Sequence, residues 1–166
     1  MLTCALLLVL GLASLTDMRQ RRIPNALTLP TIGLGLLLHL ALFGLDGLRE
    51  SAQGAGLGFV MLFGLFALGW MGAGDVKLMA AVGALQGVEF VFYAALWGAV
   101  FGGVFALTGL LRSRRLGLAV AHLYYSRLTP QVGGTFISAW RVPYAPAIAL
   151  GSLLVLQGVR WISIPV

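Results

Sequence analysis

Charged residues are scarce in this chain of 166 residues: they make up 10% of it, whereas 60% of it is hydrophobic. A soluble domain carries roughly 25% charged residues. With a mean hydropathy of +0.98, the chain has too little polar surface to cover a globule in water, so a soluble fold is excluded. At about 20 residues per membrane span, the length allows a single helical bundle. We therefore expect residues 1–166 to form one integral-membrane domain.

Cysteine is nearly absent, and its scarcity excludes two further classes of protein. The single cysteine, Cys4, lies in the first apolar run, so neither an intramolecular disulfide nor a paired-cysteine zinc site can form. The two histidines, His39 and His122, have no companion ligands at metal-binding spacing. We therefore expect no metal and no other cofactor.

Acidic residues are also few: five stand against eleven lysines and arginines, which gives a net charge of +6. In a soluble protein this excess would suggest a nucleic-acid partner. In a membrane protein the excess is explained by the lysines and arginines that gather on cytoplasmic loops. We therefore expect contact with the lipid bilayer and none with nucleic acid.

The apolar runs predict an all-α bundle of six transmembrane helices. The expected spans cover about 2–16, 26–45, 52–71, 76–85, 90–111 and 143–162. Pro24 removes a backbone donor and ends the first helix. The first run lacks the preceding basic residues of a cleavable signal, so we expect it to be retained. The polar stretch 112–141 contains apolar residues at spacings that could lie flat on the membrane surface.

The charges predict the orientation of the bundle. If the first helix enters from outside, only Arg49 and Arg160 of the eleven basic residues fall on the outer face. The remaining nine are then cytoplasmic, as the positive-inside rule requires. Both termini are therefore expected outside the cytoplasm. Asp17 and Asp75 are then the only acids on the cytoplasmic face, because the other three (Asp46, Glu50 and Glu89) lie opposite.

Asp17 and Asp75 are the candidate catalytic residues. An ionised carboxylate at membrane depth is costly, so each suggests a functional site, and a pair suggests two groups that share a proton and activate water. Ordinary roles exist for both. Asp17 could be a loop residue whose charge is matched by Arg19 or Arg21, and Asp75 could be the N-cap of the fourth span. Their joint placement on one face favours the pair.

Several neighbours are candidate positioning or substrate-binding residues. Gly72 and Gly74 weaken any helix before Asp75 and allow another backbone, such as an extended peptide substrate, to approach the carboxylate. Lys77 either reaches the lipid headgroups or orients the aspartate or the substrate. Asn25 is expected to be a helix N-cap more often than a substrate contact.

Two glycine pairs and two prolines have ordinary structural explanations. Gly54 with Gly58, and Gly98 with Gly102, have the spacing that lets helices pack closely. Pro143 and Pro146 open the sixth span, where proline is common. The alternative for the prolines is that irregular backbone there lines a substrate groove.

These motifs resemble the type IV prepilin peptidases, a family of GxGD-type membrane aspartic proteases. The resemblance rests on Asp17 before Ile23-Pro24-Asn25, on the segment Gly72–Leu78 (Gly-Ala-Gly-Asp-Val-Lys-Leu), and on the late segment Pro143–Ala147. It implies six helices, Asp17 and Asp75 as the catalytic dyad, and an inner-membrane location. It also implies removal of a short basic leader from prepilin, pseudopilin or preflagellin-type precursors at the cytoplasmic face.

The chain departs from the longer members of that family. Those members carry a cytoplasmic insertion between the first two helices, with paired cysteines associated with zinc and N-methylation. Here few residues separate Asp17 from the second span, and there is a single cysteine. The chain resembles the short members, and we expect no methyltransferase activity.

Two alternatives to this function remain open. One is a broader GxGD protease that cuts other membrane peptides. The other is a non-catalytic transporter or proton relay that uses the two aspartates. A relay should show further polar groups across the membrane, whereas this sequence offers His39 and isolated hydroxyls there.

Overall fold

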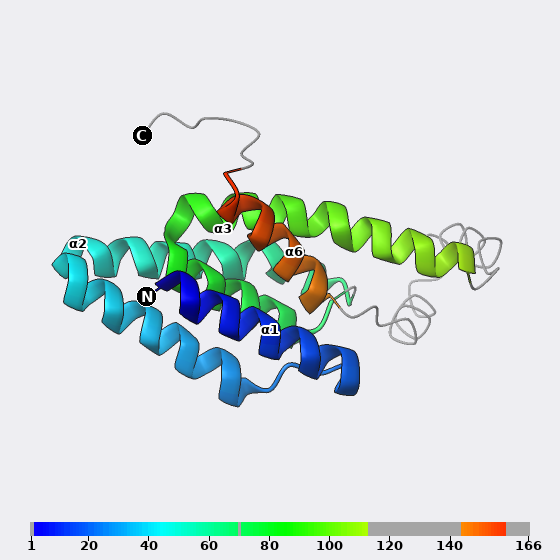
Figure 1. The fold of residues 1–166 in the computed structure, drawn as a ribbon, viewed down its shortest axis with the longest axis horizontal. Coiled ribbons are helices and arrows are strands. Elements are labelled where there is room, and N and C mark those ends of the chain that lie inside the picture. Colours follow the sequence, from blue (N-terminus) through cyan, green and yellow to red (C-terminus); the bar gives the residue numbers. More distant parts are fainter. Residues whose placement is uncertain (1, 70, 113–143, 159–166) are drawn as a thin grey trace.

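The computed structural model describes residues 2–69, 71–112 and 144–158. All regular structure in these ranges is α-helical, so the expected all-α class is confirmed (Figure 1). The helices are α1 (Leu2–Gln20), α2 (Asn25–Ala67), α3 (Ala73–Arg112) and α6 (Ala145–Leu156). Pro143, most of the polar stretch 112–141 and the end of the expected sixth span lie outside the described residues.

Helices α2 and α3 are each bent sharply at a glycine. Gly44 has φ 68° and Gly87 has φ 82°, a conformation that glycine adopts without steric cost. In Figure 1 the ribbon reverses direction at both positions, so each helix consists of two segments. The break expected at 86–89 is confirmed.

The break expected at 46–50 was wrong in its position. The chain turns at Gly44, and residues 46–50 are helical. There Arg49 and Asp46 form an exposed ion pair at 3.3 Å, one turn apart on the same helix face. Such pairs support a helix instead of ending it.

Within the residues that the structure describes, three helices are long and apolar enough to cross a membrane: Leu2–Gln20, Asn25–Ala67 and the Ala73–Gly109 part of α3. The described helix α6 is shorter, with 12 residues. Large apolar side chains on the outside of the bundle are widely exposed, among them Leu8, Leu37 and Val60. Lipid tails are as apolar as these side chains, so this surface suits a bilayer.

Glycines bring α2 and α3 into close contact along their length. A Cβ atom on Gly54 would overlap the carbonyl oxygen of Gly83, and one on Gly58 would lie 2.5 Å from the carbonyl oxygen of Met79. The packing role expected for this pair is therefore confirmed. Ser51 adds a hydrogen bond from its hydroxyl to the carbonyl of Ala84 at 2.7 Å.

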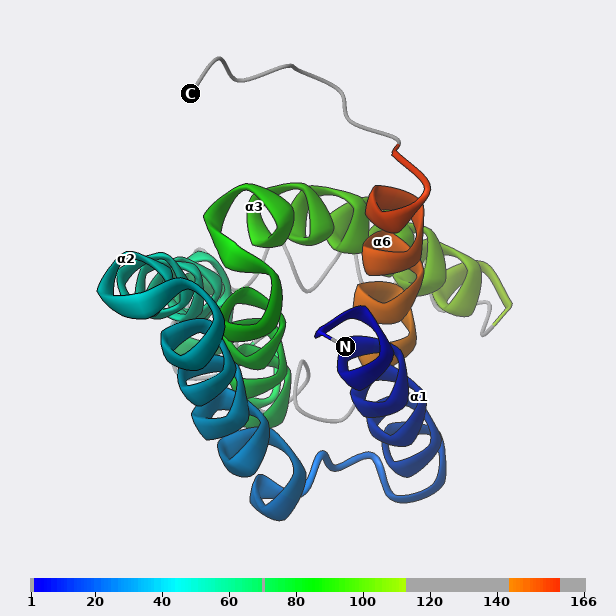
Figure 2. The ribbon, with the colours of Figure 1, turned by 60° about the vertical axis from the view of Figure 1, so that its left-hand side comes forward.

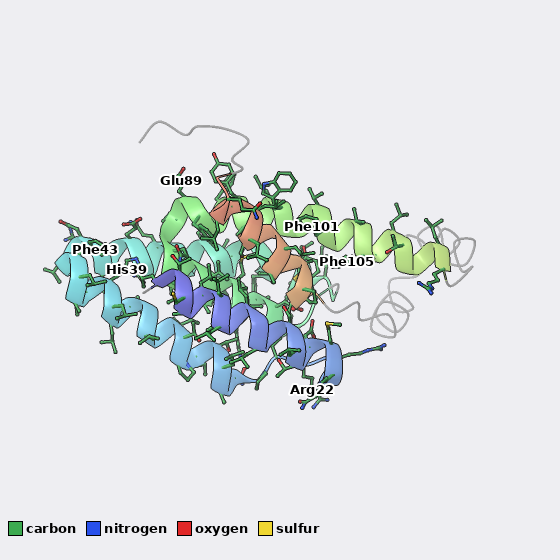
Figure 3. The ribbon with its side chains drawn as sticks, viewed as in Figure 1. Arg22, His39, Phe43, Glu89, Phe101 and Phe105 are labelled. Carbon is green, nitrogen blue, oxygen red and sulfur yellow. The ribbon has the colours of Figure 1, made fainter. Side chains whose placement is uncertain are left out.

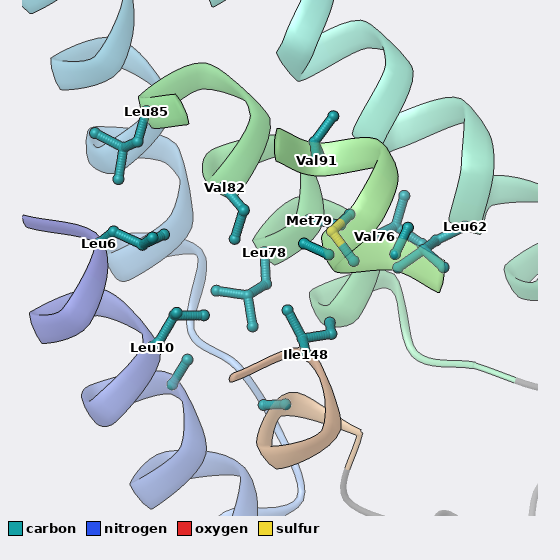
Figure 4. Close-up of a cluster of buried hydrophobic side chains, with 14 of the residues drawn as sticks. Leu6, Leu10, Leu62, Val76, Leu78, Met79, Val82, Leu85, Val91 and Ile148 are labelled. Atoms are coloured by element: carbon teal, nitrogen blue, oxygen red, sulfur yellow. The ribbon is translucent and has the colours of Figure 1, made fainter. Parts of the chain in front are cut away.

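The apolar core lies where α1, α3 and α6 meet. Leu6 and Leu10 of α1 face Leu78 and Val82 of α3, and Ile148 of α6 closes the cluster (Figure 4). Seen from the side in Figure 2, α6 lies between α1 and the second segment of α3. This arrangement brings the start of α6 to the end of the bundle where α1 finishes.

Candidate active site

Asp17 is buried in the last part of α1, with 6% of its surface exposed. Its Oδ2 atom accepts a hydrogen bond from the backbone N–H of Ala145 at 3.1 Å, and the backbone of Tyr144 also interacts with this carboxylate. The loop role considered for Asp17 is wrong, because α1 continues to Gln20 and turns the side chain inwards. A residue near one end of the chain is thus held by the start of α6.

Asp75 is equally enclosed, with 9% of its surface exposed, in the first turn of α3. Its Oδ2 atom accepts a hydrogen bond from the N–H of Gly72 at 3.2 Å, while its own N–H donates to the carbonyl of Gly72 at 3.1 Å. The expected start of this helix was three residues too late. Asp75 is therefore not the N-cap: it reaches back from the first turn, as the acidic residue of a capping box does.

Tyr144 connects the surroundings of the two aspartates. Its phenol lies within electrostatic reach of the Asp75 carboxylate. The backbone of residues 144 and 145 meets Asp17. Sequence reasoning did not single out Tyr144 or Ala145, although both lie in the segment Pro143–Ala147.

Pro146 leaves the hydrogen bonding at the start of α6 undisturbed. It lies in the first turn, where a proline N–H would have no helical partner in any case. The N–H groups of Ala147 and Ile148 both donate to the carbonyl of Tyr144. The N–H of Ala145 therefore remains to donate to Asp17.

Gly74 makes room for the backbone of Ile23, which belongs to this chain and not to a peptide substrate. A Cβ atom on Gly74 would lie 3.0 Å from Cβ of Ile23 and 3.4 Å from its backbone N and O atoms. Ile23 is itself buried. At Gly72, a Cβ atom would lie 3.2 Å from Oδ2 of Asp75. Gly74 thus allows the connection between α1 and α2 to pack against the start of α3, and Gly72 leaves room for the Asp75 carboxylate.

Asn25 and Lys77 bind each other. The Lys77 ammonium donates to Oδ1 of Asn25 at 2.9 Å, which joins the start of α2 to the start of α3. The capping role expected for Asn25 is wrong: Pro24 occupies the N-cap position, and no side chain caps this helix. The bond is exposed, and it lies beside the connection that Gly74 accommodates.

Arginines are clustered at the end of the bundle where α1 finishes. Arg19, Arg21 and Arg22 are exposed at the end of α1 and just beyond it. Arg22 lies far from His39 and Phe43, which mark the opposite end of α2's first segment (Figure 3). Both buried aspartates thus lie at the basic end of the molecule.

Comparison with known proteins gives one family. The model of the type IV leader peptidase family matches residues 4–107, a range that contains both aspartates. The prepilin leader peptidase/N-methyltransferase of Escherichia coli (strain K12) is 29% identical over 157 residues, which cover 90% of this chain and 60% of the relative. The protein of the same name from Bacillus subtilis (strain 168) is 30% identical over 155 residues, which cover 88% of this chain and 51% of the relative.

The chain therefore spans between half and two thirds of the length of these relatives. A third protein of that name, from Aeromonas salmonicida (strain A449), is 35% identical over 122 residues, which cover 66% of this chain and 40% of the relative. No solved structure matches the chain.

Proposed function

Because the chain belongs to the type IV leader peptidase family, we propose that it is a membrane aspartic endopeptidase. Its substrates are prepilin-like precursors (type IV pilins, pseudopilins or preflagellin-type proteins), from which it removes the short basic leader at the cytoplasmic face. The names of the E. coli and B. subtilis relatives support this substrate class. The proposal does not include methyl transfer, because residues 21–24 alone connect α1 to α2 and the chain has one cysteine.

The observation that carries the proposal is that both enclosed carboxylates border one segment, residues 144 and 145. Asp17 accepts the amide of Ala145, and Asp75 acts electrostatically on the Tyr144 phenol. Two neighbouring carboxylates away from bulk water do not both ionise readily, so the pair retains one proton. The ionised member then removes a proton from water, and the protonated member donates to the scissile carbonyl oxygen or the leaving amine.

The residues around the pair have supporting roles in this proposal. Gly72 leaves room for the Asp75 carboxylate, and Gly74 lets the connection between α1 and α2 pack against the start of α3. The bond between Lys77 and Asn25 ties that connection to α3. Pro146 starts α6 without using the amide that binds Asp17. Pro143 is assigned from the sequence alone, as a residue whose irregular backbone helps to line the substrate groove.

The proposed arrangement in the membrane has one domain, residues 1–166, with six spans and both termini outside the cytoplasm. The proposal is supported by the two bends, which divide α2 and α3 into two segments each, and by the distribution of arginines. The arrangement puts the aspartates at the cytoplasmic side, where a basic leader is available.

The decisive experiment compares Asp17→Asn and Asp75→Asn with the wild type in membranes. The probe is a tagged precursor with a short lysine-rich leader followed by a hydrophobic helix. We expect each variant to lower cleavage at least about 10³-fold, because acid–base catalysis by one group contributes roughly 10²–10⁴-fold and the two carboxylates act together. The matched control is Asp46→Asn, whose side chain is exposed and pairs with Arg49; it should cleave as the wild type does.

Retention of substantial cleavage by either active-site variant, at protein levels equal to those of the control, would overturn the two-aspartate mechanism. Loss of cleavage in both active-site variants, with Asp46→Asn equal to the wild type, would show that carboxylates are required at positions 17 and 75 in particular.

A further inference from the structure

The aromatic ring of Tyr144 lies where Gly102 has no side chain. A Cβ atom on Gly102 would overlap Cε2 of the ring and lie 2.8 Å from its Cζ and 3.0 Å from its Cδ2. Gly102 belongs to the second segment of α3 and is buried. The spacing of Gly98 and Gly102 predicts close packing of a helix at Gly102. In the structure, Gly102 accommodates one aromatic ring.

A second close contact fixes α6 against the same segment. A Cβ atom on Gly151 would lie 2.6 Å from the backbone N of Gly98, one turn before Gly102 on α3. Helix α6 is thus held at two heights along α3: by backbone contact at Gly151 and by the Tyr144 ring at its beginning. Because interiors are close-packed, a shift of the ring has to move the backbone that carries it.

That backbone supplies the amide that binds Asp17. The hydrogen bond from the Ala145 N–H to Oδ2 of Asp17 is 3.1 Å long, near the upper end of the usual range of about 2.7–3.2 Å. An outward displacement of a few tenths of an ångström would therefore weaken it. The backbone of Tyr144 also hydrogen-bonds Asp17, and it moves with the ring as the Ala145 amide does. The later groups of this turn offer no further donor, because Pro146 has no N–H and those of Ala147 and Ile148 bind the carbonyl of Tyr144.

We propose that Tyr144 is a positioning residue: its ring, seated over Gly102, sets the backbone amide of Ala145 against Asp17 and so holds that carboxylate in its working position. This inference rests on the proposed peptidase function. It assigns the role to the ring and its packing, and the phenol oxygen is not required for it.

The test is a set of variants at Gly102 and Tyr144, with a control at Gly103, that leaves both carboxylates in place. Gly102→Ala adds one methyl group against the ring. Gly103→Ala is the matched control, because a Cβ atom there meets nothing within 4 Å. Tyr144→Ala and Tyr144→Leu remove the ring, whereas Tyr144→Phe keeps it. The double variant Gly102→Ala/Tyr144→Ala adds the methyl group where no ring remains.

Cleavage of the tagged lysine-rich precursor is measured at varied substrate concentration. We expect kcat to fall about 10- to 100-fold in Gly102→Ala, Tyr144→Ala and Tyr144→Leu, with KM changed little, because misplacement of a reacting group by 1 Å can cost about 100-fold. Tyr144→Phe should recover most of the loss seen in Tyr144→Ala. The double variant should be no slower than Tyr144→Ala, since the added methyl group then has no ring to displace.

A second measurement does not depend on cleavage. An apolar carbodiimide modifies carboxyl groups, and mass spectrometry reports the extent of modification at Asp17. We expect this modification to be greater in Gly102→Ala and Tyr144→Leu than in the wild type and Gly103→Ala, because the carboxylate is released from the start of α6.

The outcomes separate this inference from the proposed function. Cleavage by Asp17→Asn would overturn the peptidase mechanism itself. With Asp17→Asn inactive, a Gly102→Ala enzyme that equals Gly103→Ala in kcat and in Asp17 modification would overturn the role of the ring. A Tyr144→Phe enzyme as slow as Tyr144→Ala would also overturn it and assign the role to the hydroxyl.

Discussion

Asp17 and Asp75 are enclosed carboxylates that each accept a hydrogen bond from a backbone amide, Asp17 from Ala145 and Asp75 from Gly72. Arg19, Arg21 and Arg22 are exposed nearby. A backbone amide orients a carboxylate without adding a full positive charge beside it, which would favour the ionised form more strongly. Such a group can act as an acid or a base.

A substitution of Gly74 tests how closely the connection between α1 and α2 must fit beside Asp75. We expect Gly74→Ala to change the free energy of unfolding by no more than about 1 kcal/mol, because the gain in helix propensity offsets a contact of 3.0 Å with Ile23. Ile23 must move by a few tenths of an ångström, so cleavage should fall about 3- to 10-fold, a fraction of the loss caused by a 1 Å shift. Thermal unfolding and the cleavage assay measure the two effects.

The control for this variant is Gly64→Ala, where an added Cβ atom meets nothing within 4 Å. An unchanged cleavage rate in Gly74→Ala would show that the position of Ile23 does not matter for the site.

Among the elements, the pairing of α2 with α3 depends on glycine at the points of closest approach. At Gly54 the neighbouring atoms are backbone atoms of α3, at Gly83 and Gly87. Backbone cannot rotate away as a side chain does, so an added methyl group must separate the helices. The same pairing positions the first turn of α3, from which Asp75 projects.

We therefore expect Gly54→Ala to lower the free energy of unfolding by about 2 kcal/mol or more, since overpacking typically costs 1–3 kcal/mol. Gly56→Ala should instead leave the protein as stable as the wild type or raise its stability by up to about 1 kcal/mol, because a Cβ atom there meets nothing within 4 Å. The midpoints of thermal unfolding in one detergent compare the two. If both variants melt at the same temperature, the close contact at Gly54 is not needed for stability.

For the whole molecule, the basic end and the bend at Gly44 predict an orientation in the membrane. The first segment of α2, residues 25–43, is about 28 Å long at 1.5 Å per residue, close to the roughly 30 Å of the hydrocarbon core. We therefore expect Arg22 and Arg49 on opposite sides of the bilayer. The excess of basic residues with Arg22 predicts that its side is the cytoplasmic one.

This orientation is tested with single cysteines and a membrane-impermeant thiol reagent. In a Cys4→Ala background, we expect Arg49→Cys to react in intact cells and Arg22→Cys to react only after the membrane is opened. Both arginines are exposed, so access within the protein does not limit the reaction. The reverse pattern would invert the proposed orientation, and reaction of both cysteines in intact cells would contradict the spanning of α2.

The sequence by itself determined the class of the protein and its candidate residues. Low charge and long apolar runs require a helical membrane bundle, because backbone polar groups in lipid must bond within the chain. Asp17 and Asp75 could be singled out from the cost of acids near a membrane. Local patterns also indicated the break at 86–89 and the close packing at Gly54 and Gly58.

Only the tertiary structure decided which groups meet. The bond from Ala145 to Asp17 joins residues 128 positions apart, and the contact of Tyr144 with Gly102 depends on the depth at which α6 lies against α3. Asparagine is a common N-cap residue, yet Asn25 instead accepts a hydrogen bond from Lys77, 52 residues away. Such partners are set by packing between helices, which local propensity does not encode.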